Sequence, residues 1–330
     1  MKNTFFIISA LTLIIGTAGC VATKASNTDN LPLNNKNNIV IKSSNAHNAA
    51  SRLVGSGNII SKSEKISNNY TTIKASRGVK VEMSEAGGDT ATIKADDNVM
   101  PHVIFEVSGG VLNVSISNKE YSSISNCTVI ATIPANDNIT AINASSAAEV
   151  TIRPALTNSK LDINTSSAAK VVMTGVLKIG EMDIDTSSSA SIQIVKAEVK
   201  ELDASTSSAG KISGAFNADN CELEASSAAS INMELLAVEC SADASSAGNI
   251  TLSGECATME AEASSGASIN GKKFCAHKHA DATASSGGDV KIKVAKSLKA
   301  TASSGGDVRY FPVNGSISLV SRGDVKQGTF

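Results

Sequence analysis

The sequence predicts an all-β protein built as a single-stranded parallel β-helix, a solenoid in which each coil has about 20 residues. Three observations predict this fold. One short pattern recurs at ten positions, apolar residues alternate with polar ones inside each repeat, and aromatic residues make up only 3% of the chain, with no Trp. A core of stacked small and β-branched side chains is therefore favoured over a conventional globular core.

The repeated pattern is Ser-Ser, two small residues, one variable residue, and Val or Ile. Successive copies begin 18 to 21 residues apart, and a propeller blade would need about 40 residues. Helical repeats are disfavoured because Ser-Ser-Gly-Gly and β-branched residues oppose helix formation. The copies begin at Ala144, Thr165, Thr186, Thr206, Ala225, Ala244, Ala263, Ala284, Ala302 and, in degenerate form, Val320.

Inside each repeat the hydrophobic period is two, as expected for half-buried strands. Residues 161–165 alternate apolar and polar, and residues 171–173 form a second short strand after the Ser-Ser step. We expect right-handed coils that advance about 4.8 Å each along the axis. One β-branched position per repeat should stack as an inward ladder: Val150, Val171, Ile192, Ile212, Ile231, Ile250, Ile269, Val290 and Val308.

The Ser-Ser step is interpreted as a sharp corner. A small side chain fits there, and its hydroxyl can bond to the corner backbone or to the Ser one coil away. Ser145, Ser166, Ser187 and Ser207 begin this row. A row of nucleophiles is rejected because no His or Lys base recurs beside them.

Residues 1–19 read as a lipoprotein signal peptide, with Lys2, an apolar stretch too short to span a bilayer, and small residues before Cys20. This segment resembles a bacterial lipobox, which implies acylation of Cys20. An ordinary signal peptide cleaved nearby is the alternative. Residues 20–51 are rich in Asn, Ser, Thr, Ala and Lys and are expected to form a flexible tether.

The rest of the chain, residues 52–330, is assigned to the β-helix. Residues 144–330 contain the regular repeats. Residues 52–143 hold looser versions of the same unit and are expected to form wider N-terminal coils that close this end, since solenoids need atypical terminal repeats.

These motifs resemble the auto-transporter adhesin head GIN domain family, long carried as a domain of unknown function. The resemblance rests on Val54–Asn58, Ser76–Val81, Val129–Pro134, the Ser-Ser repeats and Gly323–Val325, and covers about residues 53–326. It implies a parallel β-helix on a cell-envelope lipoprotein with a conjectural adhesive role, and it brings no catalytic residues.

Charge excludes some partners. The formal net charge is −2 with no long run of either sign, which argues against nucleic acid. Two acidic rows are expected to stack outward. Asp162, Asp183, Asp203 and Glu222 form the first, and Asp185, Glu224 and Asp243 form the second. A solvated face, weak Ca²⁺ binding and a polyvalent ligand face are the three interpretations.

The cysteines and histidines offer weaker candidates. Cys221 and Cys240, like Cys256 and Cys275, are 19 residues apart, so each pair is predicted to occupy equivalent positions in adjacent coils. Two disulfides are then possible in an exported protein, with stacked free thiols as the alternative. Cys275, His277 and His279 have metal-binding spacing but lack a fourth ligand, so no metal site is predicted. Arg322–Asp324 spells Arg-Gly-Asp, which the repeat template explains.

Taken together, these features predict a non-enzymatic envelope lipoprotein, a surface adhesin or binding solenoid, with no catalytic residue and no cofactor. The expected partners are the membrane, through the lipid anchor, and a glycan or surface protein. The location is the outer membrane, on its cell-surface or periplasmic side. Alternatives are a polysaccharide-acting β-helix enzyme, disfavoured because the short repeats leave no loop to build a cleft, and a periplasmic scaffold for a partner protein.

Overall fold

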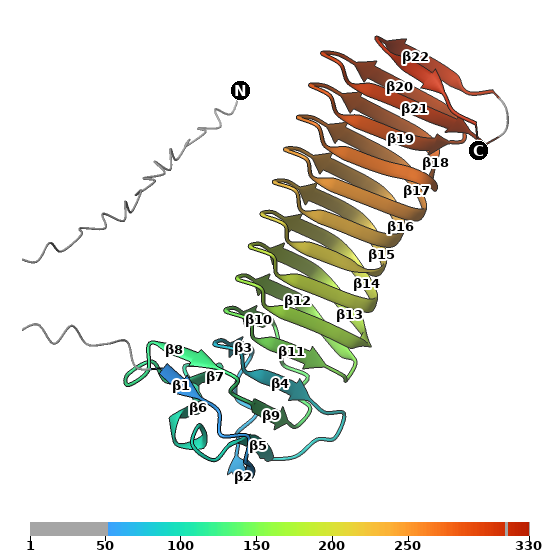
Figure 1. The fold of residues 1–330 in the computed structure, drawn as a ribbon. Coiled ribbons are helices and arrows are strands. Elements are labelled where there is room, and N and C mark those ends of the chain that lie inside the picture. The colour runs from blue at the N-terminus through green and yellow to red at the C-terminus, as the bar shows by residue number, and fades with distance from the viewer. Residues whose placement is uncertain (1–51, 314–315, 330) are drawn as a thin grey trace, which may run out of the picture. The chain divides into compact units, whose positions relative to one another are not determined.

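The computed structural model describes residues 52–313 and 316–329, and these form a β-solenoid of about nine turns (Figure 1). The signal peptide, Cys20 and the tether lie outside the described residues. The regular coils consist of β10 (Ala141–Ala144), β11 (Glu149–Ile152), β12 (Leu156–Thr165), β13 (Lys170–Thr186), β14 (Ser191–Thr206), β15 (Lys211–Ala225), β16 (Ser230–Ala244), β17 (Asn249–Ala263), β18 (Ser268–Ala284), β19 (Asp289–Val294), β20 (Ser297–Ala302), β21 (Asp307–Pro312), β22 (Ser318–Arg322) and β23 (Val325–Gln327).

The predicted inward ladder is confirmed. Val150 pairs with Val171, Val171 with Ile192, and the register continues residue for residue to Val308. All nine side chains are at most 1% exposed. Burying a Val or Ile side chain contributes about 1.5–3 kcal/mol, so this single column supplies much of the free energy that holds the coils together.

The Ser-Ser corners are tight turns with an unusual backbone. Ser167 and Ala168 have φ values of 52° and 60°, and the amide of Ala169 donates to the carbonyl of Ser166 at 3.1 Å. Two successive positive φ values define a type I′ turn, which normally favours Asn-Gly. Each turn also donates to the next coil, as Ala168 does to the carbonyl of Ser188 at 3.0 Å. The corners are therefore joined by backbone hydrogen bonds, and the residue that follows the two left-handed positions, Ala169, is buried, so a small side chain fits there.

This turn geometry leads to a first prediction. Ala168→Gly is expected to stabilise the protein by about 0.5–1 kcal/mol. The left-handed conformation costs an L-residue about 1–2 kcal/mol, and Gly avoids this cost. Gly loses more backbone entropy on folding, which offsets part of the stabilisation. Gly287→Ala is the reverse change at an equivalent turn, where φ is 75° and an added Cβ meets no atom within 4 Å. Urea unfolding of both variants checks the prediction, and shifts of the same sign would contradict it.

The N-terminal region is built from β1 (Arg52–Val54), β2 (Ile59–Lys65), β3 (Thr72–Ala75), β4 (Lys80–Met83), β5 (Thr90–Asp96), the 3₁₀ turn η1 (Met100–His102), β6 (Val103–Ser108), β7 (Val111–Ile116), β8 (Ser123–Ser125) and β9 (Val129–Ile133). Its coils do not stack in sequence order. Strand β3 lies between β7 and β10, and β4 lies between β9 and β11. The coil of residues 72–83 is thus inserted between a later segment and the first regular coil.

Antiparallel strands close this end. Strand β5 pairs antiparallel with both β2 and β9, and β6 pairs antiparallel with β7. An atypical region therefore closes this end, and its coils stack out of sequence order. A parallel coil cannot end itself, because its edge leaves backbone groups unpaired, whereas antiparallel strands can fold back over that edge.

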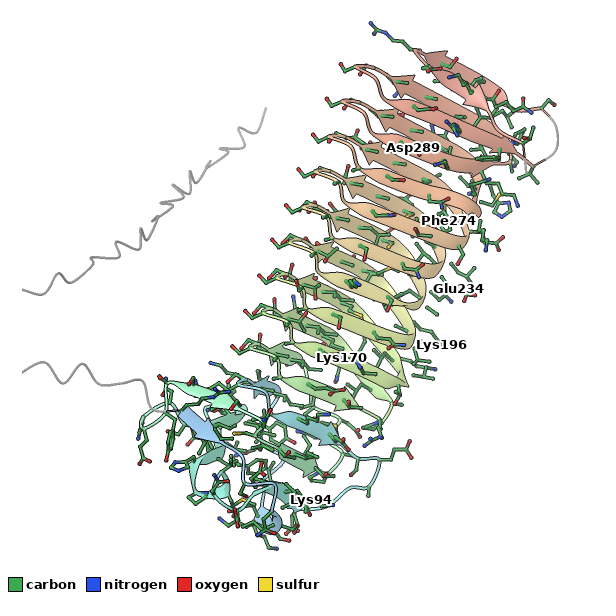
Figure 2. The ribbon with its side chains drawn as sticks, in the orientation of Figure 1. Lys94, Lys170, Lys196, Glu234, Phe274 and Asp289 are labelled. Carbon is green, nitrogen blue, oxygen red and sulfur yellow. The ribbon has the colours of Figure 1, made fainter. Side chains whose placement is uncertain are left out.

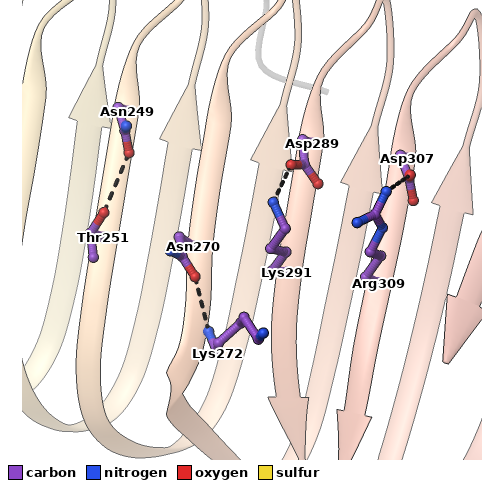
Figure 3. Close-up of polar contacts among 8 residues, drawn as sticks. All are labelled: Asn249, Thr251, Asn270, Lys272, Asp289, Lys291, Asp307 and Arg309. Carbon is purple, nitrogen blue, oxygen red and sulfur yellow. Dashed lines mark hydrogen bonds and ion pairs between the residues drawn. The ribbon is translucent and has the colours of Figure 1, made fainter. Parts of the chain in front are cut away.

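Polar contacts within single strands hold part of the face that follows the Ser-Ser turns (Figure 3). Lys291 donates to Asp289, and Arg309 donates to Asp307 at 2.9 Å, each two residues along the same strand. Asp289 stacks on Asp307, and Lys291 on Arg309, so like charges stack and each strand neutralises its own pair. In the first coils the same face has ion pairs between coils instead, from Lys80 and Lys170 to Glu149.

Candidate binding groove

A concave acidic surface lies on the segment of each coil that precedes the Ser-Ser turn. In register, Asp162, Asp183, Asp203 and Glu222 form one outward column. Asp185, Ser205, Glu224 and Asp243 form a second column two residues further along each strand. Both predicted acidic rows are confirmed. Glu260 and Glu262 extend them into the next coil.

Asp183, Asp203, Glu222 and Glu260 of the first column line a groove of about 660 Å³ that runs across β13 to β18, and the second column lies beside it. Inward-facing Leu202, Cys221, Cys240 and Met259 contribute to its floor, while the walls carry carboxylates. We call it the acidic groove and define it by Glu181, Asp183, Glu201, Asp203, Glu222, Glu239, Glu260 and Asp281. The sequence predicted the rows but not this concavity.

Two lysines show how the groove binds ammonium groups. At the end nearest the N-terminal coils, the Nζ atom of Lys160 lies 2.9 Å from Glu181, 2.9 Å from Asp183 and 3.2 Å from Asp162. At the other end, Lys299 pairs with Asp281 at 2.5 Å. One ammonium thus bridges carboxylates from two adjacent coils, and these neighbours raise the pKa of Lys160 above its ordinary value.

Between these ends the carboxylates have no cation. Within residues 52–313 and 316–329, no ion pair involves Glu201, Asp203, Glu222, Glu224, Glu239, Asp243, Glu260 or Glu262. Like charges one coil apart repel, and this repulsion is strongest where the groove shields them from water. The centre of the groove is therefore a run of uncompensated negative charge.

Burial and this repulsion raise the pKa values of two carboxyl groups, those of Asp243 and Asp203. Partial burial, with Glu262, Glu224, Glu260 and Glu222 nearby, raises the pKa of Asp243 to about 6. Burial together with Glu222 and Asp183 also raises the pKa of Asp203. Both groups hold their protons longer in the folded state than in the unfolded chain. Their ionisation therefore destabilises the solenoid.

We predict a pH-dependent effect of Asp243→Asn. The ordinary pKa is 3.8 and the folded value about 6, so the wild-type protein loses stability as pH rises through this window, and the loss is complete above it. After allowing for screening at a part-exposed site, the substitution should stabilise the protein by about 1 kcal/mol at pH 7. At pH 3.5 it should have no effect. Urea unfolding at both pH values checks this, and equal effects would contradict it.

The cysteine pairs differ from each other. Cys221 and Cys240 are in register on adjacent strands, and both are buried free thiols. A hydrogen bond from the Cys240 thiol to Cys221, together with burial, raises the pKa of the Cys240 thiol. Their disulfide stays a prediction, which peptide mapping without reductant would test.

The predicted equivalence of Cys256 and Cys275 is wrong. Register shifts between β17 and β18 place Cys256 opposite Ala276, and Cys275 opposite Glu255. Phe274 and Ala276 are fully buried on either side of Cys275, so its side chain points to the opposite face of the strand. The two thiols therefore lie on opposite faces of the sheet. The equal spacing of 19 residues hid a one-residue bulge of β18 between Asn270 and Lys273.

The histidines of β18 are engaged in hydrogen bonds. The Nε2 atom of His277 lies 2.8 Å from Glu255, and the Nδ1 atom of His279 lies 2.9 Å from the hydroxyl of Ser297. That hydroxyl donates its only proton to the carbonyl of Lys278 at 3.0 Å, so the histidine ring donates to it. No cluster of three metal-ligating side chains occurs in the described part of the chain. Sequence reasoning missed the His279–Ser297 pair because the two residues lie in different coils.

The Arg322–Asp324 tripeptide lies on a repeat corner. Gly323 has φ of 85°, and an added Cβ would lie 1.8 Å from the carbonyl oxygen of Ala302. Asp324 forms an ion pair with Lys326. Close packing between coils is therefore sufficient reason for this Gly.

Comparison with known families identifies the fold. A sequence model described as "Putative auto-transporter adhesin, head GIN domain" matches residues 69–215 and again 192–312. The chain belongs to this head GIN domain family. The two overlapping matches cover both the closed N-terminal region and the regular coils, so one family pattern spans most of the solenoid. No curated protein matches the chain.

One solved structure shares the fold of this chain at low sequence identity, and a second is reported for its similarity. A "putative lipid binding protein" from Parabacteroides distasonis is 15% identical, with a TM-score of 0.51, and the match covers 84% of this chain and all of that one. A "putative adhesin" from Parabacteroides merdae is 18% identical with a TM-score of 0.48, covering 85% of this chain and all of that one. The described residues contain no helix with the length and hydropathy of a membrane span.

Proposed function

We propose that this head GIN protein is a lipid-anchored, non-enzymatic binding protein of the bacterial outer membrane, and that its ligands bind the acidic groove through cationic groups. The observation that carries the proposal is the bridging of two coils by Lys160, whose ammonium lies within 3.2 Å of three carboxylates. Glu201 and Asp203 repeat the Glu181–Asp183 pair in the next coil, and single carboxylates, Glu222, Glu239 and Glu260, continue along the groove without a cation. A ligand with ammonium or guanidinium groups along an extended chain matches it.

Electrostatics favour such a ligand. Bringing a cation between stacked carboxylates relieves the repulsion from Glu222 and Asp183 that, together with burial, raises the pKa of Asp203. Rows of carboxylates one coil apart, about 4.8 Å, accept several ammonium groups at once, and each contact adds to the total affinity. Acylation of Cys20, followed by the 20–51 tether, would hold this surface away from the bilayer.

A binding experiment tests the groove. Poly-L-lysine should bind the purified protein at low ionic strength, and Asp203→Asn, Glu222→Gln and Glu260→Gln together should weaken binding by about tenfold or more. Asp219→Asn with Glu234→Gln is the control, because both residues are exposed and lie outside the groove. Equal affinity of the groove variant and the control would overturn the proposal.

A second experiment tests the anchor and the exposed side. Intact cells are treated with a membrane-impermeant label and with protease, and Cys20→Ala is compared with the wild-type protein for incorporation of labelled fatty acid. Labelling of intact cells would support surface adhesion. Protection until the outer membrane is broken would overturn adhesion and leave a periplasmic scaffold, for which cross-linking would find partners.

A further inference from the structure

Charge is segregated along the solenoid. Residues 181–262 contain 15 acidic and 3 basic residues, whereas residues 271–330 contain 10 basic and 4 acidic residues. The acidic stretch includes the centre of the groove, and the basic stretch begins at β18. This division is hidden by the formal net charge of −2.

Strand β18 has an irregular course where the basic stretch begins. Gly271 of β18 lies opposite Ile292 of β19, and Cys275 lies opposite the next residue, Lys293. Residues 272–274 of β18 therefore have no partner in the next coil. Phe274 is fully buried. It lies on the same edge of the solenoid as Lys196 and Glu234, which belong to earlier coils (Figure 2). Burying this ring leaves Lys273 exposed on the outside of the bulge.

Four lysines form what we call the basic edge: Lys272, Lys273, Lys278 and Lys296. The Nζ atom of Lys272 lies 4.8 Å from the centre of the Phe311 ring. Lys273, Lys278 and Lys296 are exposed and make no ion pair with any described residue. Other cations nearby, such as Lys299 and Arg309, are each neutralised by an Asp.

Lys278 and Lys296 lie on adjacent coils, because their strands pair at Ala276 with Val294 and at His279 with Ser297. Their mutual repulsion is unrelieved within the described chain. The acidic groove presents the complementary arrangement, with unpaired carboxylates on adjacent coils at the same repeat distance. A protruding row of ammonium groups and a concave row of carboxylates share one spacing, set by the solenoid itself.

From this complementarity we infer that two copies of the protein associate, with the basic edge of one copy bound in the acidic groove of the other. This inference rests on the proposed function, because it names a partner for the same groove. Lys160 provides the intramolecular precedent, since a single lysine there bridges carboxylates of two coils. The contact is predominantly ionic, so it should weaken strongly with salt.

Analytical ultracentrifugation of the full chain tests this, with Cys20→Ser present so that acyl chains do not drive association. Dimers are expected at low ionic strength, with at least about tenfold weaker association at 0.5 M NaCl. The edge variant, Lys273→Glu with Lys278→Glu and Lys296→Glu, should be monomeric. So should the groove variant, Asp203→Asn with Glu222→Gln and Glu260→Gln. Lys211→Glu, an exposed lysine on another face, should associate like the starting protein.

Mixing the edge variant with the groove variant tests whether the basic edge of one copy binds the groove of the other. The edge variant retains the groove, and the groove variant retains the basic edge, so an equimolar mixture should form a one-to-one complex although neither variant associates alone. A monomeric parent protein at low salt, or a mixture without a complex, would overturn the inference. If poly-L-lysine still binds the groove in that case, the proposed function stands and only the self-association falls. If poly-L-lysine also fails to bind, both fall.

Discussion

Gly254→Ala is expected to destabilise the solenoid by about 3 kcal/mol or more, from a left-handed backbone penalty plus overpacking. Gly254 has φ of 111°, and a Cβ added there would lie 2.1 Å from the carbonyl oxygen of Leu235 in the preceding coil. The obstacle is backbone that pairs with its neighbour, so it cannot rotate away as a side chain would. The coils would have to separate locally, with loss of hydrogen bonds between β16 and β17.

Gly266→Ala is the matched control. Gly266 also has a positive φ, 71°, but an added Cβ meets no atom within 4 Å, so only the net conformational cost of about 0.5–1 kcal/mol is expected. Urea unfolding monitored by circular dichroism compares the two variants. Equal losses would show that contact with Leu235 contributes nothing and that the coils can shift to admit a methyl group.

Phe274→Ala is expected to cost about 3–5 kcal/mol, because it leaves a cavity where a fully buried aromatic ring fills the bulged coil. Contacts in a solenoid are made only between neighbouring coils, so the damage should be local. Hydrogen exchange should increase mainly in β17, β18 and β19, with little change in β12 or β13. Val238→Ala removes an apolar side chain that is 51% exposed and should change stability by no more than about 0.5 kcal/mol.

A uniform increase in exchange along all coils after Phe274→Ala would contradict the local view and indicate that the solenoid unfolds as one unit. An effect below 1 kcal/mol would indicate that the bulge of β18 collapses around the cavity. In that case the basic edge should also move, and the self-association of the variant would report it.

The regular coils were predictable because their information is local and periodic. The position of Val171 in its repeat determines that of Ile192 in the next one, since both follow a Ser-Ser turn at the same distance. The turn positions show the same dependence. The Ser-Ser step at Ser166 and Ser167 was expected to form a corner, and the structure adds that Ser167 and Ala168 adopt a left-handed conformation.

The N-terminal coils and the second cysteine pair could not be predicted in the same way. Strand β3 pairs with β7 and β10, although several strands of this region have a similar residue pattern. Backbone hydrogen bonds form equally well with any of them, so the pattern does not specify which strands pair. Cys256 and Cys275 keep the spacing of the repeat, but a one-residue bulge of β18 between Asn270 and Lys273 moves Cys275 to the other face. A one-residue shift reverses the direction of a side chain, and nothing in the spacing records it.

The sequence alone determined the solenoid, its coil length, its inward ladder and the existence of acidic rows, because each follows from a residue pattern that repeats at close to 20 positions. Only the tertiary structure decided that these rows line a concave groove, that Lys160 and Lys299 neutralise only its ends, and that four lysines protrude from one edge of the later coils. Curvature, bulges and ion pairing depend on the packing of each coil against its neighbours. Periodicity specifies which residues stack, whereas packing between coils specifies the shape and charge of the surface that they form.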